Sequence, residues 1–296
     1  MTMVMGKLPE FEYSEPSSVH EAFEILRRNP GAMVLAGGTD LILSMRQREI
    51  KPTQLVNIKR IPGLDRIQID EKGGLRIGAL TTIGAIENSE LIQDAFPVLA
   101  DAAHHLGSFQ IRHRATLGGN LCNASPCADT AAPLIALGAF AKIAGPRGER
   151  MVKLEEFFVG PGETVLSRDE ILTEVQVPKP ERDSYGAFLK HGPRNAMDIA
   201  TVNAALMVTM REKTCLDARI VLGSVAPVPM RARKAEAAIC GKSVDEREVA
   251  SVAEIASSEC SPISDVRGSA DYRRAIVKVM VGRLFQKAVP PRLFMS

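Results

Sequence analysis

The spacing of apolar and polar positions divides the chain into short segments of helical and strand period. Ser18 and Glu21 form a capping box, and apolar residues follow at helical spacing until Asn29. Residues 32–36 form an apolar run that predicts a strand, and a second helix is expected to begin near Leu41. The glycine pair between this strand and this helix therefore lies in a strand-to-helix turn.

The rest of the chain continues this alternation in two blocks. Strands are predicted at residues 55–58, 64–69, 75–80, 139–144, 151–154 and 171–177, and helices at 97–107 and 129–137. The polar, turn-rich stretch 179–183 is the expected domain boundary. Beyond it come apolar segments at 185–189, 199–210 and 218–225, and helices near 231–239, 249–256 and 269–286. The pattern predicts an α+β fold: a larger N-terminal part, then a three-stranded sheet with helices.

Length and charge narrow the possible functions. At 296 residues the chain exceeds the usual size of one domain, so two domains are expected. The net charge of +2 argues against a chain whose main partner is nucleic acid. Short basic clusters, such as residues 112–114, are better explained as solvated or ion-paired surface. No apolar run reaches the roughly 18 residues that span a membrane, and the N-terminus lacks the apolar core of a signal peptide, which favours a cytoplasmic location.

The five cysteines do not form a recognisable framework. They are odd in number and spread over a long chain, and no CxxC pair occurs. Cys122 and Cys127 are separated by four residues, without a second pair at zinc or iron–sulfur spacing. A disulfide framework and a metal site are therefore not predicted, and the cysteines are expected to be buried or reduced structural thiols.

Two Gly-Gly loops carry the strongest chemical signal, Ala36-Gly37-Gly38-Thr39-Asp40 and Thr116-Leu117-Gly118-Gly119-Asn120. Glycines let successive backbone N–H groups turn toward one anion and keep side chains out of its way. Neither turn contains a lysine or an arginine, which suits a phosphodiester or pyrophosphate held by amides. On spacing alone, two ordinary turns explain the glycine pairs about equally well.

Asp129 and Lys190 stand out after the loops. Asp129 is expected to cap the helix that follows it, and Lys190 comes directly after an apolar run, where a solvated lysine at a strand end is the simplest interpretation. The standard nucleotide motifs fail: GxGxxG is absent, and Gly241-Lys242-Ser243 lacks the upstream glycine of a P-loop. No nucleophile has an evident set of partners, so the sequence shows no self-contained catalytic site.

Six motifs occur in order along the chain. They are AGGTDL at 36–41, QIRHRATLGGNLCNASPCADTAAPLIAL at 110–137, GPG at 160–162, DEIL at 169–172, RNAMDIATVNAAL at 194–206 and DVRGSADYRR at 265–274. From about Phe11 to Gln286 the chain resembles the FAD-binding medium subunits of molybdenum hydroxylases, such as those of bacterial xanthine dehydrogenases and carbon monoxide dehydrogenases. The resemblance implies a two-lobed FAD-binding domain of the p-cresol methylhydroxylase type at 1–180, with lobes of about 1–60 and 61–180, and a C-terminal domain of the carbon monoxide dehydrogenase flavoprotein type at 181–296.

The resemblance also assigns residues to FAD. Met33 to Asp40 resemble the first pyrophosphate loop, and Thr116 to Asn120 resemble the second. Leu106 and Leu172 match apolar positions that sandwich adenine, and Lys190 matches a lysine beside the flavin ring. The implied FAD-binding set is Met33, Val34, Leu35, Ala36, Gly37, Gly38, Thr39, Asp40, Leu106, Thr116, Leu117, Gly118, Gly119, Asn120, Asn123, Ser125, Asp129, Leu172 and Lys190. The resemblance implies no catalytic residue and no metal ligand in this chain.

The implied function is electron transfer within a larger complex. The chain would take electrons from [2Fe–2S] clusters of a small partner subunit and pass them from FAD to NAD+ or another acceptor. A large partner subunit would hold the molybdenum cofactor and the substrate, and the complex would be a dimer of heterotrimers. A medium subunit of a carbon monoxide or aldehyde dehydrogenase is the first alternative to a xanthine dehydrogenase-like subunit. A stand-alone flavin oxidoreductase of the same superfamily is the second, and a nucleotide-binding module without redox work is the third.

Overall fold

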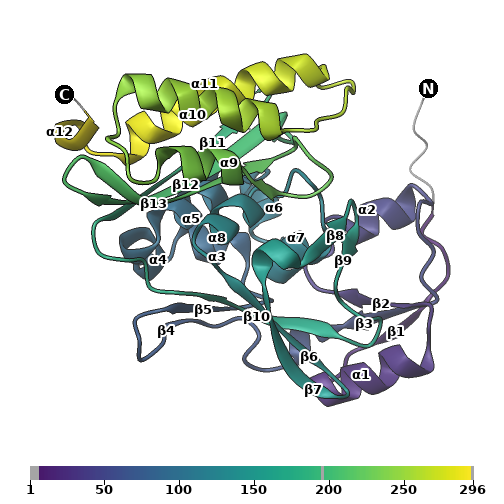
Figure 1. Ribbon diagram of the computed structural model, residues 1–296. Coiled ribbons are helices and arrows are strands. Elements are labelled where there is room, and N and C mark those ends of the chain that lie inside the picture. The colour runs from purple at the N-terminus through teal and green to yellow at the C-terminus, as the bar shows by residue number, and fades with distance from the viewer. Residues whose placement is uncertain (1–6, 195–196, 295–296) are drawn as a thin grey trace.

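The computed structural model describes residues 7–194 and 197–294 (Figure 1). Asn195 and Ala196, which belong to the motif at 194–206, lie outside the described residues. Three bodies of secondary structure follow one another along the chain: a small N-terminal unit, a central five-stranded sheet with helices, and a C-terminal four-stranded sheet with helices.

The N-terminal unit is a three-stranded parallel sheet with helices. Its elements are β1 (Glu12–Ser14), α1 (Val19–Arg28), β2 (Ala32–Leu35), α2 (Leu41–Arg46), β3 (Gln54–Asn57) and the 3-10 turn Ile58–Arg60. The strand order is β1–β3–β2, so β2 lies at an edge. Ser18 accepts a hydrogen bond from the N–H of Glu21 at 3.1 Å and begins α1, as predicted. Phe23 of α1 and Val56 of β3 belong to one small buried core.

The central sheet is antiparallel, and β10 is its middle strand. In spatial order its strands are β4 (Ile67–Ile69), β5 (Leu75–Gly78), β10 (Ile171–Val177), β6 (Phe140–Gly145) and β7 (Gly148–Lys153). The strands predicted at 64–69, 75–80, 139–144 and 151–154 are confirmed, and they pair as the hairpins β4–β5 and β6–β7. The alternation that predicted β10 is also confirmed, because its apolar positions are buried and it ends just before Pro178.

Helices cover one face of the central sheet and separate it from the C-terminal sheet (Figure 1). They are α3 (Ile83–Glu87), α4 (Glu90–Ala95), α5 (Pro97–His104), α6 (Phe109–Arg112), α7 (Leu117–Cys122) and α8 (Ala131–Ala136). The remaining small elements are the 3-10 turn Leu154–Glu156, β8 (Phe158–Gly160) and β9 (Glu163–Thr164). These helices and the central sheet share the largest buried core of the described residues.

The C-terminal sheet contains the three predicted strands and a short fourth one. Its elements are β11 (Ser184–His191), β12 (Val202–Arg211), β13 (Thr214–Gly223), β14 (Met230–Arg231), α9 (Arg233–Ile239), α10 (Glu246–Glu259), α11 (Ala270–Ala288) and α12 (Pro291–Phe294). The order is β11–β12–β13–β14, and β14 pairs with β13 through only two residues. The helices predicted in this part of the chain are confirmed.

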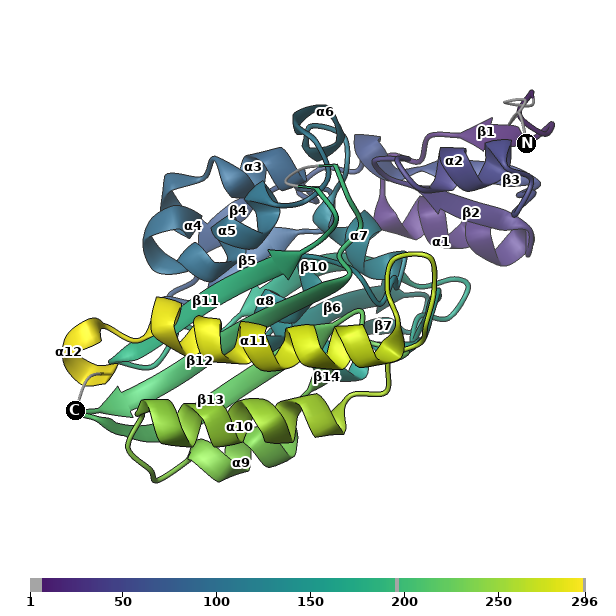
Figure 2. The ribbon, with the colours of Figure 1, turned by 90° about the horizontal axis from the view of Figure 1, so that it is seen from above.

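The C-terminal sheet lies between two layers of helices. Helices α9, α10 and α11 cover one face, while α5 and α8 pack against the other (Figures 1 and 2). Side chains alternate along each strand, so Phe188 faces the central core, whereas Ala187 and Leu189 face the C-terminal core, on the side of α11. A fully buried side chain of the size of Phe188 contributes about 1.5–3 kcal/mol. Burial on both faces therefore fixes β11, which carries Lys190.

Candidate functional site

The two Gly-Gly loops lie next to each other in the fold. A Cβ built on Gly37 would overlap the backbone carbonyl oxygen of Arg114 and lie 3.0 Å from the Cα of Ala115. Arg114 and Ala115 lead directly into Thr116, the first residue of the second loop. The close approach of the two loops therefore depends on the absence of a side chain at Gly37.

The first loop presents unpaired backbone donors. Gly38 has a φ of +78°, which favours glycine, and lies in the turn from β2 into α2. Within the described residues, the backbone N–H groups of Gly37, Gly38 and Thr39 donate no hydrogen bond. Lys59 reaches the same loop, where its Nζ donates to the carbonyl oxygen of Ala36 at 3.0 Å. Unpaired N–H groups beside an ammonium are a suitable environment for an anion.

The second loop begins α7, and its glycines have two different tasks. Gly118 donates to the carbonyl oxygen of Ala79 at 2.8 Å, and Gly119 donates to the hydroxyl of Thr116 at 3.1 Å. A Cβ on Gly118 would lie 2.7 Å from that of Ala79, so Gly118 serves packing. Apart from its chain neighbours and its own helix backbone, a Cβ on Gly119 would meet only Thr116 Oγ1 within 4 Å among the described residues. That contact, at 2.9 Å, requires the hydroxyl to shift. The expected row of free N–H groups is therefore wrong for this loop, which offers an open approach at Gly119 instead.

A buried ion pair connects the segment after the second loop with the C-terminal sheet. Lys190 Nζ lies 2.7 Å from Asp129 Oδ2 and 2.9 Å from the carbonyl oxygen of His105. Asn203 donates from Nδ2 to Asp129 Oδ1 and to the carbonyl oxygen of Cys127, both at 3.3 Å. The side chains of Lys190 and Asp129 are only 6% and 8% exposed. Each charge therefore depends on the other for its stability.

Asp129 does not cap α8, so that prediction is wrong. The N-cap residue is Thr130, and it makes no side-chain capping hydrogen bond, while the carboxylate of Asp129 contacts Lys190 and Asn203. Burial raises the pKa of Asp129, and Lys190 and Asn203 oppose this rise. Loss of a cap costs about 1 kcal/mol, whereas removing one partner of a buried ion pair costs about 3–5 kcal/mol. Removing the Lys190 partner would therefore cost more than losing a helix cap.

Several other expected residues lie on the same stretch of chain or beside it. Asn120 accepts a hydrogen bond from the hydroxyl of Thr130 at 2.6 Å. Asn123 is the exposed C-cap of α7, and Ser125 accepts a hydrogen bond from the N–H of Cys127 at 3.3 Å. The segment from Gly119 to Asp129 is thus ordered by its own side chains.

The apolar residues expected around adenine and in the first loop lie at separate places. Leu106 directly follows His105, whose carbonyl oxygen accepts from Lys190, and Leu172 lies in β10; both leucines are buried in the central core. In β2, Val34 packs on the N-terminal core, whereas Met33 is exposed. Leu35 is half-buried at the end of the strand, and Asp40 is exposed at the start of α2.

Four residues beside this site were not expected from the sequence. Lys59 and Arg114 bring positive charge to the first loop: burial lowers the pKa of Lys59, and the charge of Arg114 lowers it further. His105 and Asn203 contact the Lys190–Asp129 pair. Of these four residues, Asn203 could have been noticed in the sequence, because it is a polar residue within an apolar strand.

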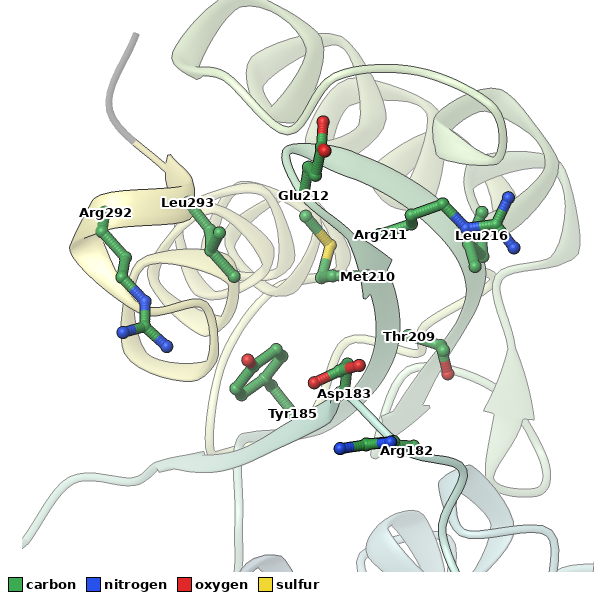
Figure 3. Close-up of a pocket in the computed structure, with 10 residues that line it drawn as sticks. All are labelled: Arg182, Asp183, Tyr185, Thr209, Met210, Arg211, Glu212, Leu216, Arg292 and Leu293. Atoms are coloured by element: carbon green, nitrogen blue, oxygen red, sulfur yellow. The ribbon is translucent and has the colours of Figure 1, made fainter.

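Two cavities lie away from this site. One of about 410 Å³ lies at the other end of β11, lined by Tyr185, Asp183 and the arginines Arg182 and Arg292, with Arg211 turned away from these two (Figure 3). It mixes guanidinium and carboxylate groups and contains none of the expected FAD residues. The other, of about 360 Å³, lies between the end of α8 and β13 and contains none of them either.

The described residues contain no cluster of metal-ligating side chains. No group of three or more His, Cys, Asp and Glu side chains in residues 7–194 and 197–294 could hold a metal ion. All five cysteines are free, and burial raises the pKa of the Cys122 thiol to about 12.

None of the helices in the described ranges has the length and apolar character needed to cross a bilayer.

The arrangement fits a dinucleotide cofactor with a central pyrophosphate. The missing side chain at Gly37 lets the second loop lie against the first, and the neighbouring N–H groups and Lys59 suit phosphate oxygens. Gly119 leaves open space on the second loop. Asp129 and Lys190 supply fixed polar groups further along. The donors and the charges present therefore suit FAD.

Comparison with known proteins agrees with this fit. Residues 9–180 match the family model of the FAD binding domain in molybdopterin dehydrogenase, and residues 187–288 match that of the CO dehydrogenase flavoprotein C-terminal domain. The glyceraldehyde dehydrogenase medium chain of Sulfolobus acidocaldarius is 33% identical over 94% of this chain and 98% of its own length. The xanthine dehydrogenase FAD-binding subunit of Escherichia coli O157:H7 is 31% identical over 94% of this chain and 95% of its own length.

A solved structure gives the same result. The chain is similar to carbon monoxide dehydrogenase from Hydrogenophaga pseudoflava lacking the Mo-pyranopterin moiety, with a TM-score of 0.93, 35% identity and coverage of 96% of this chain and 98% of that one. Both family models, the relatives and the fold identify the same protein family. The chain therefore belongs to the FAD-binding medium subunits of the molybdenum hydroxylase family and is a subunit of an oxidoreductase.

Proposed function

We propose that this chain takes electrons one at a time from [2Fe–2S] clusters of a small partner subunit, through its FAD, and passes them to NAD+ or another acceptor. The observation that carries the proposal is the contact of the two loops at Gly37, which gathers the unpaired N–H groups and Lys59 beside the second loop. Bound FAD accepts electrons singly and can release them as a hydride. The chain's own task is to bind and orient that cofactor.

Each part of the site has a distinct task in this proposal. The N–H groups of the first loop bind the pyrophosphate, and Lys59 and Arg114 offset its negative charge. Gly119 leaves room for the approach of the cofactor. The buried Lys190–Asp129 pair lies beside the flavin ring. Leu106 and Leu172 contact the adenine, and the other residues of the implied FAD-binding set complete the site.

The remaining features of the proposal concern the assembly. A large subunit holds the molybdenum cofactor and the substrate, and the complex is a dimer of heterotrimers in the cytoplasm. Within this chain, the FAD-binding domain spans residues 1–180 in two lobes, and the C-terminal domain spans 181–296. Relatives named for glyceraldehyde, xanthine and carbon monoxide match nearly the whole chain, which supports a shared role in electron transfer with the substrate bound elsewhere.

Purification from the native host tests the assembly. A tagged chain is expected to bring down two further chains together with molybdenum and iron. A chain that purifies alone, yellow and active toward a substrate of its own, would support the stand-alone flavin oxidoreductase and contradict the proposal.

Anaerobic reduction of the purified complex tests the electron path. After the substrate reduces the complex, added NAD+ is expected to give NADH in the wild type. The matched control is a complex with Gly37→Ala, in which the FAD site is disturbed: its iron–sulfur centres should be reduced but should not pass electrons to NAD+. If a Gly37→Ala complex from which FAD had been removed still formed NADH at the wild-type rate, the path through this chain would be refuted. A wild-type complex that reduces only another acceptor would support the alternative acceptor.

A further inference from the structure

Asn203 lies at the centre of the polar cluster without being charged itself. It is fully buried, and it is the direct cross-strand partner of Lys190 in β11 and of Gly223 in β13. Directly opposite side chains on paired strands point to the same face of a sheet, so Lys190 and Asn203 reach Asp129 from neighbouring strands. Asp129 precedes α8, the helix that packs on this face. The carboxylate is thus held between two strands of the C-terminal sheet.

The orientation of the Asn203 amide is determined by its acceptors. Its Nδ2 faces two acceptors, Asp129 Oδ1 and the carbonyl oxygen of Cys127, both at 3.3 Å. Its Oδ1 is buried and has no hydrogen-bond partner among the described residues. A flipped amide would place Oδ1 against two oxygens and lose both hydrogen bonds. The side chain therefore leaves one of its own atoms unsatisfied in order to donate to the carboxylate.

The neighbouring strand makes room for this arrangement. A Cβ at Gly223 would overlap Asn203 Oδ1, so a larger residue there would displace the amide. An unsatisfied buried polar atom costs about 1–3 kcal/mol. The two hydrogen bonds that Nδ2 donates at the other end of the amide offset the cost of the unsatisfied Oδ1. Here that end contacts one oxygen of Asp129, and Lys190 contacts the other.

We propose that Asn203 is a positioning residue of the flavin site, which keeps Asp129 ionised and paired with Lys190, so that the cofactor meets a fixed ion pair without net charge. The placement of the flavin beside Lys190 rests on the proposed function. The charged groups that face Asp129 are Lys190 on β11 and His105 at the C-cap of α5, and His105 in turn contacts Asp101. Loss of the amide donor leaves burial less opposed, so Asp129 takes up a proton more readily.

An infrared pH titration of the FAD-free chain tests this proposal directly. In Asn203→Leu, the protonated-carboxyl band of Asp129 is expected to persist to a pH about one unit or more above that of the wild type, as for the loss of a hydrogen bond to a charged group. The band is identified by its absence in Asn203→Leu with Asp129→Asn. Thr201→Val is the matched control: Thr201 is buried just before β12 and has no side-chain hydrogen bond to Asp129. It should titrate like the wild type.

A second variant and a second readout complete the test. Asn203→Ala removes the donor without adding bulk beside Gly223 and should give the same upward shift. In FAD-loaded chains of either variant, the flavin reduction potential should acquire a pH-dependent step that Asp129→Asn abolishes. An unshifted titration, or unfolding of both variants, would overturn the role of Asn203. An infrared shift with an unchanged potential would support that role and refute the placement of the flavin beside Lys190.

Discussion

The Cα of Gly37 lies against the carbonyl oxygen of Arg114, and no side chain fits between them. Gly37 belongs to the turn between β2 and α2, and Arg114 precedes the residues that begin α7. This contact joins two parts of the chain that are almost eighty residues apart, and it brings the unpaired N–H groups of the first loop to the second. The cofactor site therefore depends on a backbone contact that only glycine permits.

Substitution of Gly119 should separate cofactor binding from folding. Gly119→Val places a branched side chain in the open space that the cofactor would enter, so we expect FAD retention to be lost. Valine is a better helix former than glycine, and α7 should still form. The measurement is the ratio of FAD to protein after purification, with thermal unfolding of the FAD-free chain as the control. A folded Gly119→Val chain with normal FAD content would contradict this prediction.

Removing Lys190 alone should lower the free energy of unfolding more than replacing both Lys190 and Asp129 by uncharged residues. Lys190→Met leaves a buried carboxylate without its partner, and we expect a loss of about 3–5 kcal/mol in the free energy of unfolding. Combined Lys190→Met and Asp129→Asn should recover most of this loss, because no buried charge remains. Urea unfolding of the FAD-free chains gives the comparison. Additive losses in the double variant would show that the pair does not act as a unit.

Glu170 at the start of β10 should make stability depend on pH in the acid range. Arg150 forms two hydrogen bonds with it, at 2.9 and 2.7 Å, and the N–H of Ser167 donates another at 2.9 Å. Arg150 first, and then Ser167, lower the pKa of Glu170 from 4.5 to about 2. A lowered pKa in the folded state stabilises the fold above pH 4.5, and this contribution is lost as the pH falls toward 2. Wild type should therefore exceed Glu170→Gln in stability at neutral pH, and the two should converge near pH 2.

Thermal unfolding between neutral pH and pH 2 measures this convergence. Arg150→Gln removes the same ion pair from the other side and serves as the matched control. Its stability difference from the double variant Arg150→Gln with Glu170→Gln should depend on pH less than the difference between wild type and Glu170→Gln, because the Ser167 N–H still contacts the carboxylate. A constant gap between wild type and Glu170→Gln across this range would show that Glu170 acts through packing alone.

Local sequence was sufficient for most of the secondary structure. The Ser18–Glu21 capping pair, the alternation in β10 and the buried stripe of α10 (Val249, Val252, Ala253 and Ala256) each determine an element from within a few residues. Several short elements were not predicted, among them β1, α3, α4 and β14. The two residues of β14 pair with β13 only after the sheet has formed. A strand of two residues is too short to show an alternation of apolar and polar positions in the sequence.

The sequence predicted the two loops of the site but not the hydrogen bonds and ion pairs that its residues form. The Gly-Gly pairs marked both loops, but the hydrogen bond from the Gly118 N–H to the carbonyl oxygen of Ala79 depends on how α7 packs beside the residue that follows β5. Asp129 was expected to cap a helix because local rules cannot see Lys190, sixty-one residues away. Lys59 gave no signal at all, since a surface lysine and a lysine beside a phosphate loop look alike in sequence.

Titration of the FAD-free chain with FAD, followed by flavin fluorescence, tests the central claim most directly. Gly37→Ala should bind FAD about 10–100-fold more weakly, because a methyl group forced against the Arg114 backbone costs about 1–3 kcal/mol. Gly282→Ala, at a helical glycine of α11 with no atom of the described residues within 4 Å of a built Cβ, should bind FAD like the wild type. Equal affinity of the wild type and a folded Gly37→Ala chain would contradict the account of a cofactor site made by the two loops.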